Sequence, residues 1–441
     1  MRSEGTRSDD TRVGAILGPS AWLVAGAVVG RGATLVAITA VARLLSPSEF
    51  GRLAVLQVTV TLLAGVAGLG LGIALTRQVA EATASNRADA GSYVGLALLT
   101  TLVAGLVTTG IYLLARSEVA SEILQDPAAT TAVVASAGAV FFGAVATNSQ
   151  GALLGLEAFR STAVGQWSLG LGVATGLLFG AWSGGLQGAL AGLSIGTAVG
   201  AVVSTALLVN EMVARGLRIS WLPARRIWRS LWRPAAPAFV AFLTVSLALL
   251  LAQVELTRQV DGYAEVGLFN LSYRWHLALL FIPAVVVPAL LPKLTRLLAE
   301  GRELGGRRLF QLYGLGTLIL TVPPALVMTL VAVPILSLSG KYYAEHPLPL
   351  VILAVASIPS ALNNVLSTGA VGSGAIRAWL VSDVALAAVL LGLAFALAPS
   401  HAATGLAIAY LLAYIVTDAV LVYPLRRLFL SDTPQPVEGS S

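Results

Sequence analysis

Apolar residues run through this chain in long stretches that short polar segments separate. A helix needs about 20 apolar residues to cross the hydrocarbon core of a bilayer. Twelve stretches meet that length, near residues 18–41, 52–75, 92–115, 130–154, 162–182, 186–209, 236–257, 267–291, 310–335, 348–371, 379–398 and 404–424. Several connections between them carry helix breakers, among them "SPSEFG", "WSGG" and "APSH". The pattern predicts an all-α integral membrane protein with twelve transmembrane helices.

The basic residues fall unevenly between the two sides of these stretches. With the N-terminus in the cytoplasm, twenty Lys and Arg residues lie on the inner side. The outer side then has five, which are Arg43, Arg52, Arg116, Arg258 and Lys341. Because cytoplasmic loops carry an excess of Lys and Arg, we expect both termini to be cytoplasmic. This asymmetry accounts for the net charge of +6, so no nucleic-acid partner is expected.

The longest inner connection divides the twelve stretches into two sets of six. The predicted parts are a cytoplasmic tail (1–17), a first lobe (18–209), a basic linker (210–235), a second lobe (236–424) and a second cytoplasmic tail (425–441). Because six crossings return the chain to the same side, related lobes would be parallel repeats. Two segments support this, "LTRQVAE" at 75–81 and "LTRLLAE" at 294–300. Two such lobes around a shared axis are typical of alternating-access transporters.

The linker contains a pattern of its own. Arg225, Arg229 and Arg233 recur every four residues, and Trp228 and Trp232 stand beside them. On a helix these residues give a basic face and an indole face, which predicts a helix lying in the lipid headgroup layer. The alternative is a connection whose charges only fix the topology.

Composition excludes several classes of function. Charged residues make up 11% of the chain, against about 25% in soluble proteins. Cysteine is absent, and the three histidines have no metal-ligand spacing, so we expect neither thiolate catalysis nor a metal site. The sequence has no GxxxxGK[ST] phosphate-binding loop. We therefore predict a transporter and not an enzyme, with no catalytic residue and no cofactor.

The segment "ARLLSPSEFGRLAVLQVTVTLLAGVAGLGLGIALTRQVAE" at 42–81 resembles the start of the Wzx-type polysaccharide flippase family. Ser46 and Leu53 depart from its A-R-x-L-G-P-x-x-F-G-x-Y pattern, and "LLGLEAFR" (153–160) and "EVGLFNLSYRWH" (265–276) resemble later family segments. The resemblance implies the fold of the multidrug/oligosaccharidyl-lipid/polysaccharide exporter (MOP) superfamily, which includes the MATE exporters. It also implies transfer of a polyprenyl-diphosphate-linked oligosaccharide to the outer leaflet. The alternatives are a MATE-like cation-coupled exporter of small molecules and a membrane glycan polymerase or ligase.

Two arginines lie inside the predicted spans. Arg31 falls near the bilayer midplane between Gly30 and Gly32, which would leave space beside its side chain. Charges at such depth are costly and usually face a cavity or a partner. Arg31 would bind the substrate diphosphate or pair with Asp418. Arg274 would contact substrate, or brace the lobes, with Glu255 as a possible partner.

The remaining polar residues inside the spans fall into two groups. Candidates for H⁺ or Na⁺ coupling are Asp383, Asp418, Glu255 and His276, although His276 could be a core histidine and Asp383 could pair with Arg377. Candidates for sugar binding are Asn148, Gln150, Asn363 and Asn364, each of which could instead join helices together. Membrane potential is an alternative driving force. Expected partners are the lipid-linked oligosaccharide, membrane lipids, and glycosyltransferases and a polymerase of the same pathway.

Overall fold

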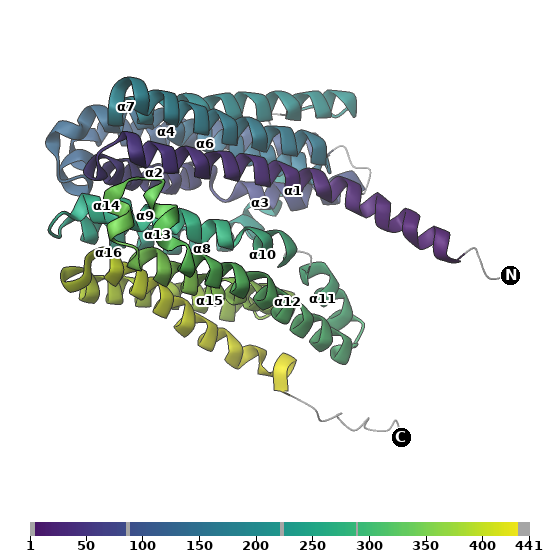
Figure 1. Cartoon of the computed structure of the whole chain (residues 1–441). Helices are drawn as coiled ribbons and strands as arrows, with labels where there is room; N and C mark the ends of the chain where they lie inside the picture. The colour runs from purple at the N-terminus through teal and green to yellow at the C-terminus, as the bar shows by residue number, and fades with distance from the viewer. Residues whose placement is uncertain (1–4, 85–88, 221–224, 288–289, 431–441) are drawn as a thin grey trace.

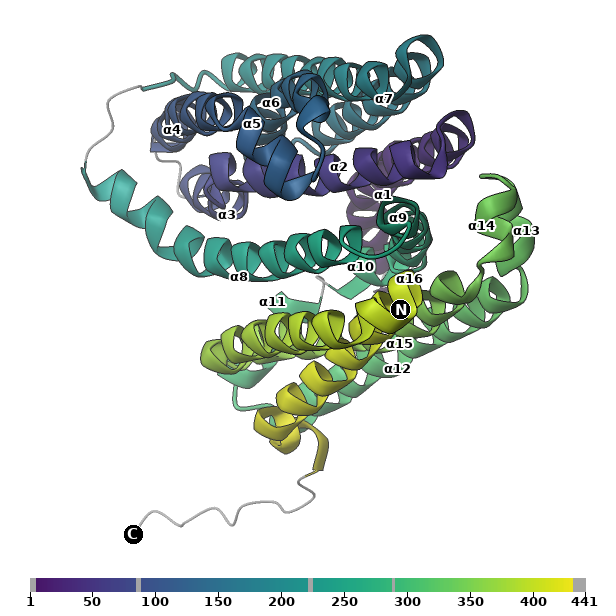
Figure 2. The same cartoon turned by 90° about the vertical axis from the view of Figure 1, so that its left-hand side faces the viewer.

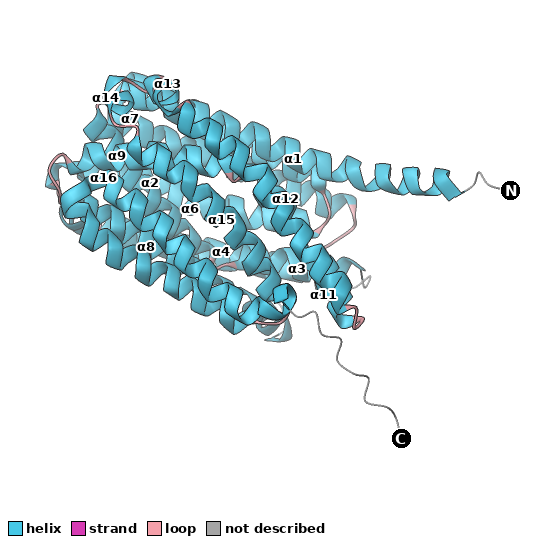
Figure 3. Cartoon of the chain, turned by 60° about the horizontal axis from the view of Figure 1, so that its bottom comes forward, coloured by secondary structure: helices cyan, strands magenta, loops and turns pink. Residues whose placement is uncertain are grey.

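A computed structural model describes residues 5–84, 89–220, 225–287 and 290–430. Within these ranges the chain is helical and has no strand (Figure 3). The helices are α1 (Gly5–Leu44), α2 (Pro47–Gly68), α3 (Leu71–Ala84), α4 (Asp89–Leu114), α5 (Arg116–Glu118), α6 (Thr130–Gly155), α7 (Phe159–Ala214), α8 (Arg225–Thr257), α9 (Gly262–Leu279), α10 (Phe281–Val286), α11 (Leu290–Ala299), α12 (Glu303–Leu330), α13 (Ala332–Ser337), α14 (Lys341–Glu345), α15 (Leu348–Gly372) and α16 (Ile376–Leu430). A π-helical turn (Val119–Ile123) and a 3₁₀ turn (Pro127–Ala129) precede α6.

Among the described residues, nine helical segments are long and apolar enough to cross a membrane. Two of the twelve predicted spans, 162–182 and 186–209, both lie in α7, and 379–398 and 404–424 both lie in α16. The predicted span 267–291 is divided among α9, α10 and α11. The multi-pass, all-helical class is therefore correct, and the count of twelve crossings stays a prediction.

Helices α7 and α16 each contain one break. Gly184 and Gly185 have non-helical backbone angles inside the 56-residue α7, and Ala402 has them inside the 55-residue α16. The angles of Gly185 (φ 57°, ψ −139°) and Ala402 (φ 45°, ψ −127°) are nearly the same. Each break lies at the same distance from its helix start, from residue 159 to 185 and from 376 to 402. Helices α7 and α16 therefore break at equivalent positions and with similar backbone angles.

A capped corner precedes α2. Ser46 caps α2, with its hydroxyl accepting from the backbone N–H of Glu49, while the Glu49 side chain accepts from the N–H of Ser46 at 3.0 Å. Pro47 occupies the first turn, where its missing N–H costs nothing. This capping box starts the helix at residue 47 and sets the direction in which α2 leaves the corner.

The helices form two groups, α1–α7 and α8–α16, which lie side by side (Figure 1). One hydrophobic core joins the two groups at one end and includes Phe50, Leu53, Phe269 and Tyr343. At the other end each group has a core of its own, around Leu75 and Leu153 in the first and around Leu294 and Phe310 in the second. We call these the joined end and the separate end of the molecule.

Two helices carry most of the contact between the groups at the joined end, α2 and α9. Their backbones approach closely, because a Cβ placed on Gly51 would lie only 1.7 Å from the carbonyl oxygen of Tyr263. On the same crossing, a Cβ on Gly267 would lie 3.0 Å from the carbonyl oxygen of Pro47. Phe50 packs edge-on against Tyr343, with ring centroids 6.0 Å apart. The backbones of α2 and α9 can approach this closely because Gly51 and Gly267 have no side chain.

The helix predicted in the linker is present, but it is not a separate element. Residues 225–235 are the first turns of α8, which continues without a break to Thr257. Ile227, Leu231 and Ala235 pack into the core of the first helix group at the separate end. The linker helix therefore begins on the first group and leads directly into the second. Of the predicted tails, residues 5–17 belong to α1 and 425–430 to α16, and residues 1–4 and 431–441 lie outside the described part.

Candidate functional site

Arg31 on α1 is exposed and faces the second group of helices. Its guanidinium carbon lies 5.6 Å from the centroid of the Phe281 ring on α10. Arg31 makes no ion pair with any described residue, so the predicted pairing with Asp418 is wrong. Asp418 instead accepts a hydrogen bond from Asn363. Among the described residues, the Arg31 charge therefore has no carboxylate partner.

The two glycines beside Arg31 have different roles. A Cβ on Gly32 would meet nothing within 4 Å. A Cβ on Gly30 would lie 2.8 Å from the carbonyl oxygen of Gln166, and one on Gly170 would lie 2.3 Å from the Cα of Gly30. The prediction that both glycines leave room beside the guanidinium is thus wrong for Gly30. Gly30 is needed because α1 packs against α7 there.

Arg274 on α9 also reaches from one helix group to the other. Its guanidinium donates a 2.9 Å hydrogen bond to the side-chain oxygen of Gln57 on α2. Glu255, its predicted partner, pairs with Arg258 at 3.3 Å instead. The pairing of Arg274 with Glu255 is therefore wrong, and the contact between the two groups is made through a neutral amide.

Together these contacts place two cationic side chains at the boundary between the groups. Arg31 extends from the first group to Phe281 of the second, and Arg274 extends from the second to Gln57 of the first. Neither forms an ion pair within the described ranges. Because a guanidinium is always charged and its charge is uncompensated here, an anion at this boundary would be stabilised.

The sequence analysis did not single out Gln57 or Phe281. Gln57 is the one amide in the apolar run "LAVLQVTV", which is a signal that could have been used. Its side chain is 8% exposed and would be costly to bury without the hydrogen bond from Arg274. Phe281 carries no such signal, because only the packing of α10 near α1 brings it to Arg31.

The two amide candidates of the first helix group lie inside it. Asn148 is 1% exposed and donates to the carbonyl oxygen of Gly68 at 3.3 Å and to the Thr101 hydroxyl at 2.6 Å. The chain breaks its helix at Leu69 and Gly70, so the Gly68 carbonyl lacks its usual helical partner. Gln150 approaches Ser204 at 3.4 Å. Both side chains join helices within one group.

The polar residues of the second helix group form a separate cluster on α15 and α16. Asn363 donates to the Asp418 carboxylate at 2.9 Å, and Asn364 lies half-buried beside it. Asp383 is half-buried on the first half of α16 and does not pair with Arg377 or any other described cation. Tyr414, one turn before Asp418, is within electrostatic reach of both carboxylates. We call Asp383, Asp418, Asn363 and Tyr414 the carboxylate cluster.

His276 is enclosed by the second helix group. It is 0% exposed, and its ring stacks on Tyr273 and meets Tyr410 edge-on. Its Nδ1 lies 2.8 Å from the carbonyl oxygen of Leu353, and because a carbonyl only accepts, Nδ1 must carry the hydrogen. This environment is that of a core histidine, one of the two interpretations that the sequence allowed.

A carboxylate on α9 connects this helix with α14 and α16. Glu265 on α9 accepts from the Tyr342 hydroxyl at 3.1 Å and from the backbone N–H of Ala403 at 3.0 Å. Burial, together with the neighbouring carboxylate of Glu265, raises the pKa of Tyr342, so its hydroxyl stays a donor. Glu265 thereby stabilises the break in α16 next to Ala402.

The sequence profile of the family described as "Polysaccharide biosynthesis protein" matches residues 17–298. The chain is a member of the polysaccharide biosynthesis protein family. No curated protein matches it with comparable significance.

Solved structures match the fold over nearly the whole chain. A multidrug resistance MATE family transporter of the MOP superfamily, in its inward-facing conformation, is 14% identical, with a TM-score of 0.78 and coverage of 92% of this chain and 96% of the other. An outward-facing conformation of such a transporter gives 15% identity, a TM-score of 0.70 and coverage of 94% and 95%. The inward closed conformation of the lipid II flippase MurJ gives 11% identity, a TM-score of 0.72 and coverage of 91% and 86%. The chain therefore has the MATE-like fold of the MOP superfamily.

Proposed function

We propose that this protein is a flippase that moves a polyprenyl-diphosphate-linked oligosaccharide from the inner to the outer leaflet during cell-surface polysaccharide synthesis. The observation that carries the proposal is the pair of arginines at the boundary between the helix groups, Arg31 and Arg274, neither neutralised by a described carboxylate. Family membership supports a role in polysaccharide synthesis. Likeness in fold to a lipid II flippase is consistent with such a role.

Arginine is suited to hold the diphosphate during transfer. Its planar fork of N–H groups donates two parallel hydrogen bonds to phosphate oxygens. Removing one such charge-assisted bond costs about 1.5–3 kcal/mol, or roughly ten- to a hundredfold in binding. Arg31 would bind the anionic head first because it is exposed, and Arg274 would exchange Gln57 for phosphate as the groups separate. Asn148, Gln150, Asn363 and Asn364 would contact sugar only after such a rearrangement.

The proposed topology follows from the long helices and the charge distribution. Counting α7 and α16 as two crossings each, and α9–α11 as one, gives twelve, in lobes 18–209 and 236–424. The start of α1 and the end of α16 lie on the same side of the molecule as α3 and α11 (Figure 1). The sequence places the excess of Lys and Arg on this side. We place this side and both termini in the cytoplasm of a bacterial cell. The separate end then opens inward, and the lobes rock about α2 and α9 in alternating access.

The driving force in this proposal is a gradient of H⁺ or Na⁺, with membrane potential as the alternative. The carboxylate cluster is the proposed coupling site, because Asp383 has no cationic partner among the described residues and Asp418 has only the neutral Asn363. Glu255 pairs with Arg258 and His276 is enclosed in the core, which makes both weaker candidates. No metal site or catalytic residue is proposed. Glycosyltransferases and a polymerase of the same pathway would supply and use the substrate.

The test is transport by the purified protein in vesicles. A fluorescent polyprenyl-diphosphate disaccharide would be placed in one leaflet, and its arrival in the other measured with a membrane-impermeant quencher. We expect the wild-type protein to transfer it, faster with an H⁺ or Na⁺ gradient, and Arg31→Ala to slow transfer ten- to a hundredfold. The matched control is Arg43→Gln, an exposed arginine at the far end of the same helix. Both variants should elute and unfold as the wild type does.

Four outcomes would contradict the proposal. Full activity of Arg31→Ala would remove this residue from the site. Equal transfer of a lipid without phosphate would show that the diphosphate is not recognised. Gradient-driven export of small organic cations without lipid transfer would favour a MATE-like exporter, whose fold this chain shares. Cleavage or elongation of the glycan would indicate a polymerase or ligase.

A further inference from the structure

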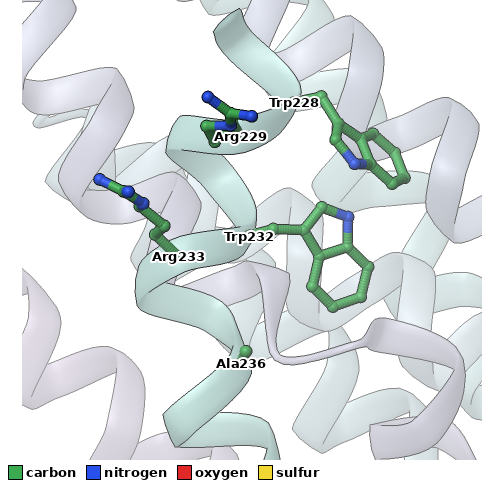
Figure 4. A pocket seen from close by; sticks show the side chains of 5 residues that line it. All are labelled: Trp228, Arg229, Trp232, Arg233 and Ala236. Atoms are coloured by element: carbon green, nitrogen blue, oxygen red, sulfur yellow. The ribbon is translucent and has the colours of Figure 1, made fainter. Parts of the chain in front are cut away.

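We propose that the exposed face at the start of α8 binds the phosphate of an anionic bilayer phospholipid through Arg229 and Arg233, with Trp228 and Trp232 beside it. These four residues line a hollow of ≈ 510 Å³ together with Ala236 (Figure 4). The inference does not depend on the proposed function, because it concerns the surface of the helix that connects the two groups and not the boundary between them.

The buried face of this helix fixes which residues are free. Ile227, Leu231 and Ala235 are 6%, 1% and 0% exposed and pack into the first group's core. Ser230 adds a 3.1 Å hydrogen bond from its hydroxyl to that of Tyr93 on α4. Because side chains three and four residues apart share one face of a helix, this packing turns the intervening residues outward. The arginines and tryptophans of the proposed site are held away from the core.

The outward residues form two neighbouring stripes. Trp228 is 44% exposed, and its ring centroid lies 5.7 Å from that of Trp232. Arg229 and Arg233 are both exposed, and neither forms an ion pair with a described residue. Figure 4 shows the two indoles on one side of the helix and the two arginines on the other, one turn apart. Residues at this spacing lie about 5–6 Å apart at Cβ, so both guanidinium groups can reach a single phosphate.

The length of α8 places these residues at the level of lipid phosphates. The helix has 33 residues, which at about 1.5 Å each span roughly 50 Å. The hydrocarbon core is only about 30 Å thick. The segment before Ala236 is the polar one, and the apolar segment that can cross follows it. The first turns of α8 therefore extend out of the hydrocarbon into the headgroup layer.

The chemistry of the face matches a membrane anion better than a soluble one. The guanidinium of arginine donates two parallel hydrogen bonds to phosphate oxygens. Tryptophan is enriched where lipid headgroups meet acyl chains. Each basic residue near an anionic membrane surface contributes about 1 kcal/mol of binding. A hollow of ≈ 510 Å³ holds a phosphate with its glycerol, since a water molecule takes up only about 30 Å³. Bound lipid would hold the start of α8 against the first helix group.

The test is native mass spectrometry of the full-length protein in detergent with added phosphatidylglycerol or phosphatidylcholine. We expect a tight phosphatidylglycerol adduct that phosphatidylcholine does not replace and that weakens as salt is raised. The double variant Arg229→Gln/Arg233→Gln should weaken this adduct about thirtyfold, the equivalent of about 2 kcal/mol. The matched control is Arg218→Gln/Arg308→Gln, which removes the same charge from two exposed positions that are not on α8.

Several results would overturn the proposal. Equal weakening in the control pair would mean that net charge, and not this face, attracts the lipid. Equal binding of phosphatidylcholine would exclude recognition of an anion. Displacement of the adduct by millimolar inorganic phosphate would assign the site to a free anion. If the variant Arg229→Gln/Arg233→Gln does not fold, the variant Arg229→Lys/Arg233→Lys replaces it in the test. Unchanged phosphatidylglycerol binding in that pair would exclude the guanidinium forks.

Discussion

The polar residues inside the membrane were recognisable one by one, but their partners were not. Similar depth on neighbouring spans makes Glu255 one candidate partner of Arg274. In the structure Arg274 donates to Gln57, 217 residues away in sequence. Depth along a helix follows from residue counting, whereas the direction of a side chain depends on the rotation of the helix. Packing of α2 against α9 sets that rotation, and no local pattern encodes it.

Asn148 offers a test of the difference between a binding residue and a structural one. Asn148→Ala leaves the Gly68 carbonyl and the Thr101 hydroxyl without the donor they have now. Leaving buried polar groups unpaired costs about 1–3 kcal/mol, so we expect clearly lower stability in thermal unfolding followed by tryptophan fluorescence. Gln150→Ala is the control, since its 3.4 Å contact with Ser204 is at the limit of a hydrogen bond. An Asn148→Ala protein as stable as wild type, but inactive, would restore Asn148 as a substrate ligand.

At the scale of elements, the sequence repeat corresponds to a structural one. Arg77 and Glu81 of "LTRQVAE" form an ion pair of 2.7 Å on α3. Arg296 and Glu300 of "LTRLLAE" form one of the same length, between the same atoms, on α11. The matching breaks in α7 and α16 add a second pair of equivalent features. These correspondences favour parallel repeats, although exposed ion pairs themselves contribute little stability.

The breaks in the long helices differ in one respect that can be tested. Gly185 has a positive φ at no cost, but Ala402 adopts nearly the same angles with a side chain. Strain of this kind costs about 1–3 kcal/mol. We expect Ala402→Gly to raise the free energy of unfolding by about 1 kcal/mol and Gly185→Ala to lower it, as measured by thermal unfolding. A destabilised Ala402→Gly would show that Glu265 and its neighbours already compensate for the strain.

At the scale of the whole molecule, the cores describe one conformational state. A single core crosses both helix groups at the joined end, while the separate end has two independent cores. In Figure 2, α8 lies on the side of the second group that faces the first. The molecule is thus held together near α2 and α9 and divided at its other end. With that end in the cytoplasm, this is the state that would accept substrate from the inner leaflet.

The contact between α2 and α9 predicts how the state can be shifted. A side chain at Gly51 would collide with the backbone of Tyr263, so Gly51→Val should separate the groups at the joined end. Because the chain has no cysteine, spin labels can be attached at Leu114→Cys and Lys341→Cys, and at Thr83→Cys and Thr295→Cys. We expect the distance between labels at positions 114 and 341 to lengthen and the distance between labels at positions 83 and 295 to shorten. Both distances are measured by electron paramagnetic resonance.

The control for this experiment is Gly110→Val, a helical glycine with open space around it. Its two label distances should equal those of the wild type. If both distances stayed constant in Gly51→Val as well, the crossing would not govern the arrangement of the helix groups. If both lengthened together, the variant would have loosened the whole fold, and rigid rocking would be wrong.

The sequence by itself determined the membrane class, the resemblance to a flippase family, the capped start of α2 at Ser46 and the positions of Arg31 and Arg274 within apolar stretches. These depend on hydrophobic length, capping and local spacing, all of which act within a few turns of helix. The tertiary structure decided that Arg31 faces Phe281 and not Asp418, that Arg274 reaches Gln57, and that Asn148 supports a helix break. Those contacts join residues far apart in sequence, and they depend on how whole helices rotate and cross as their cores pack.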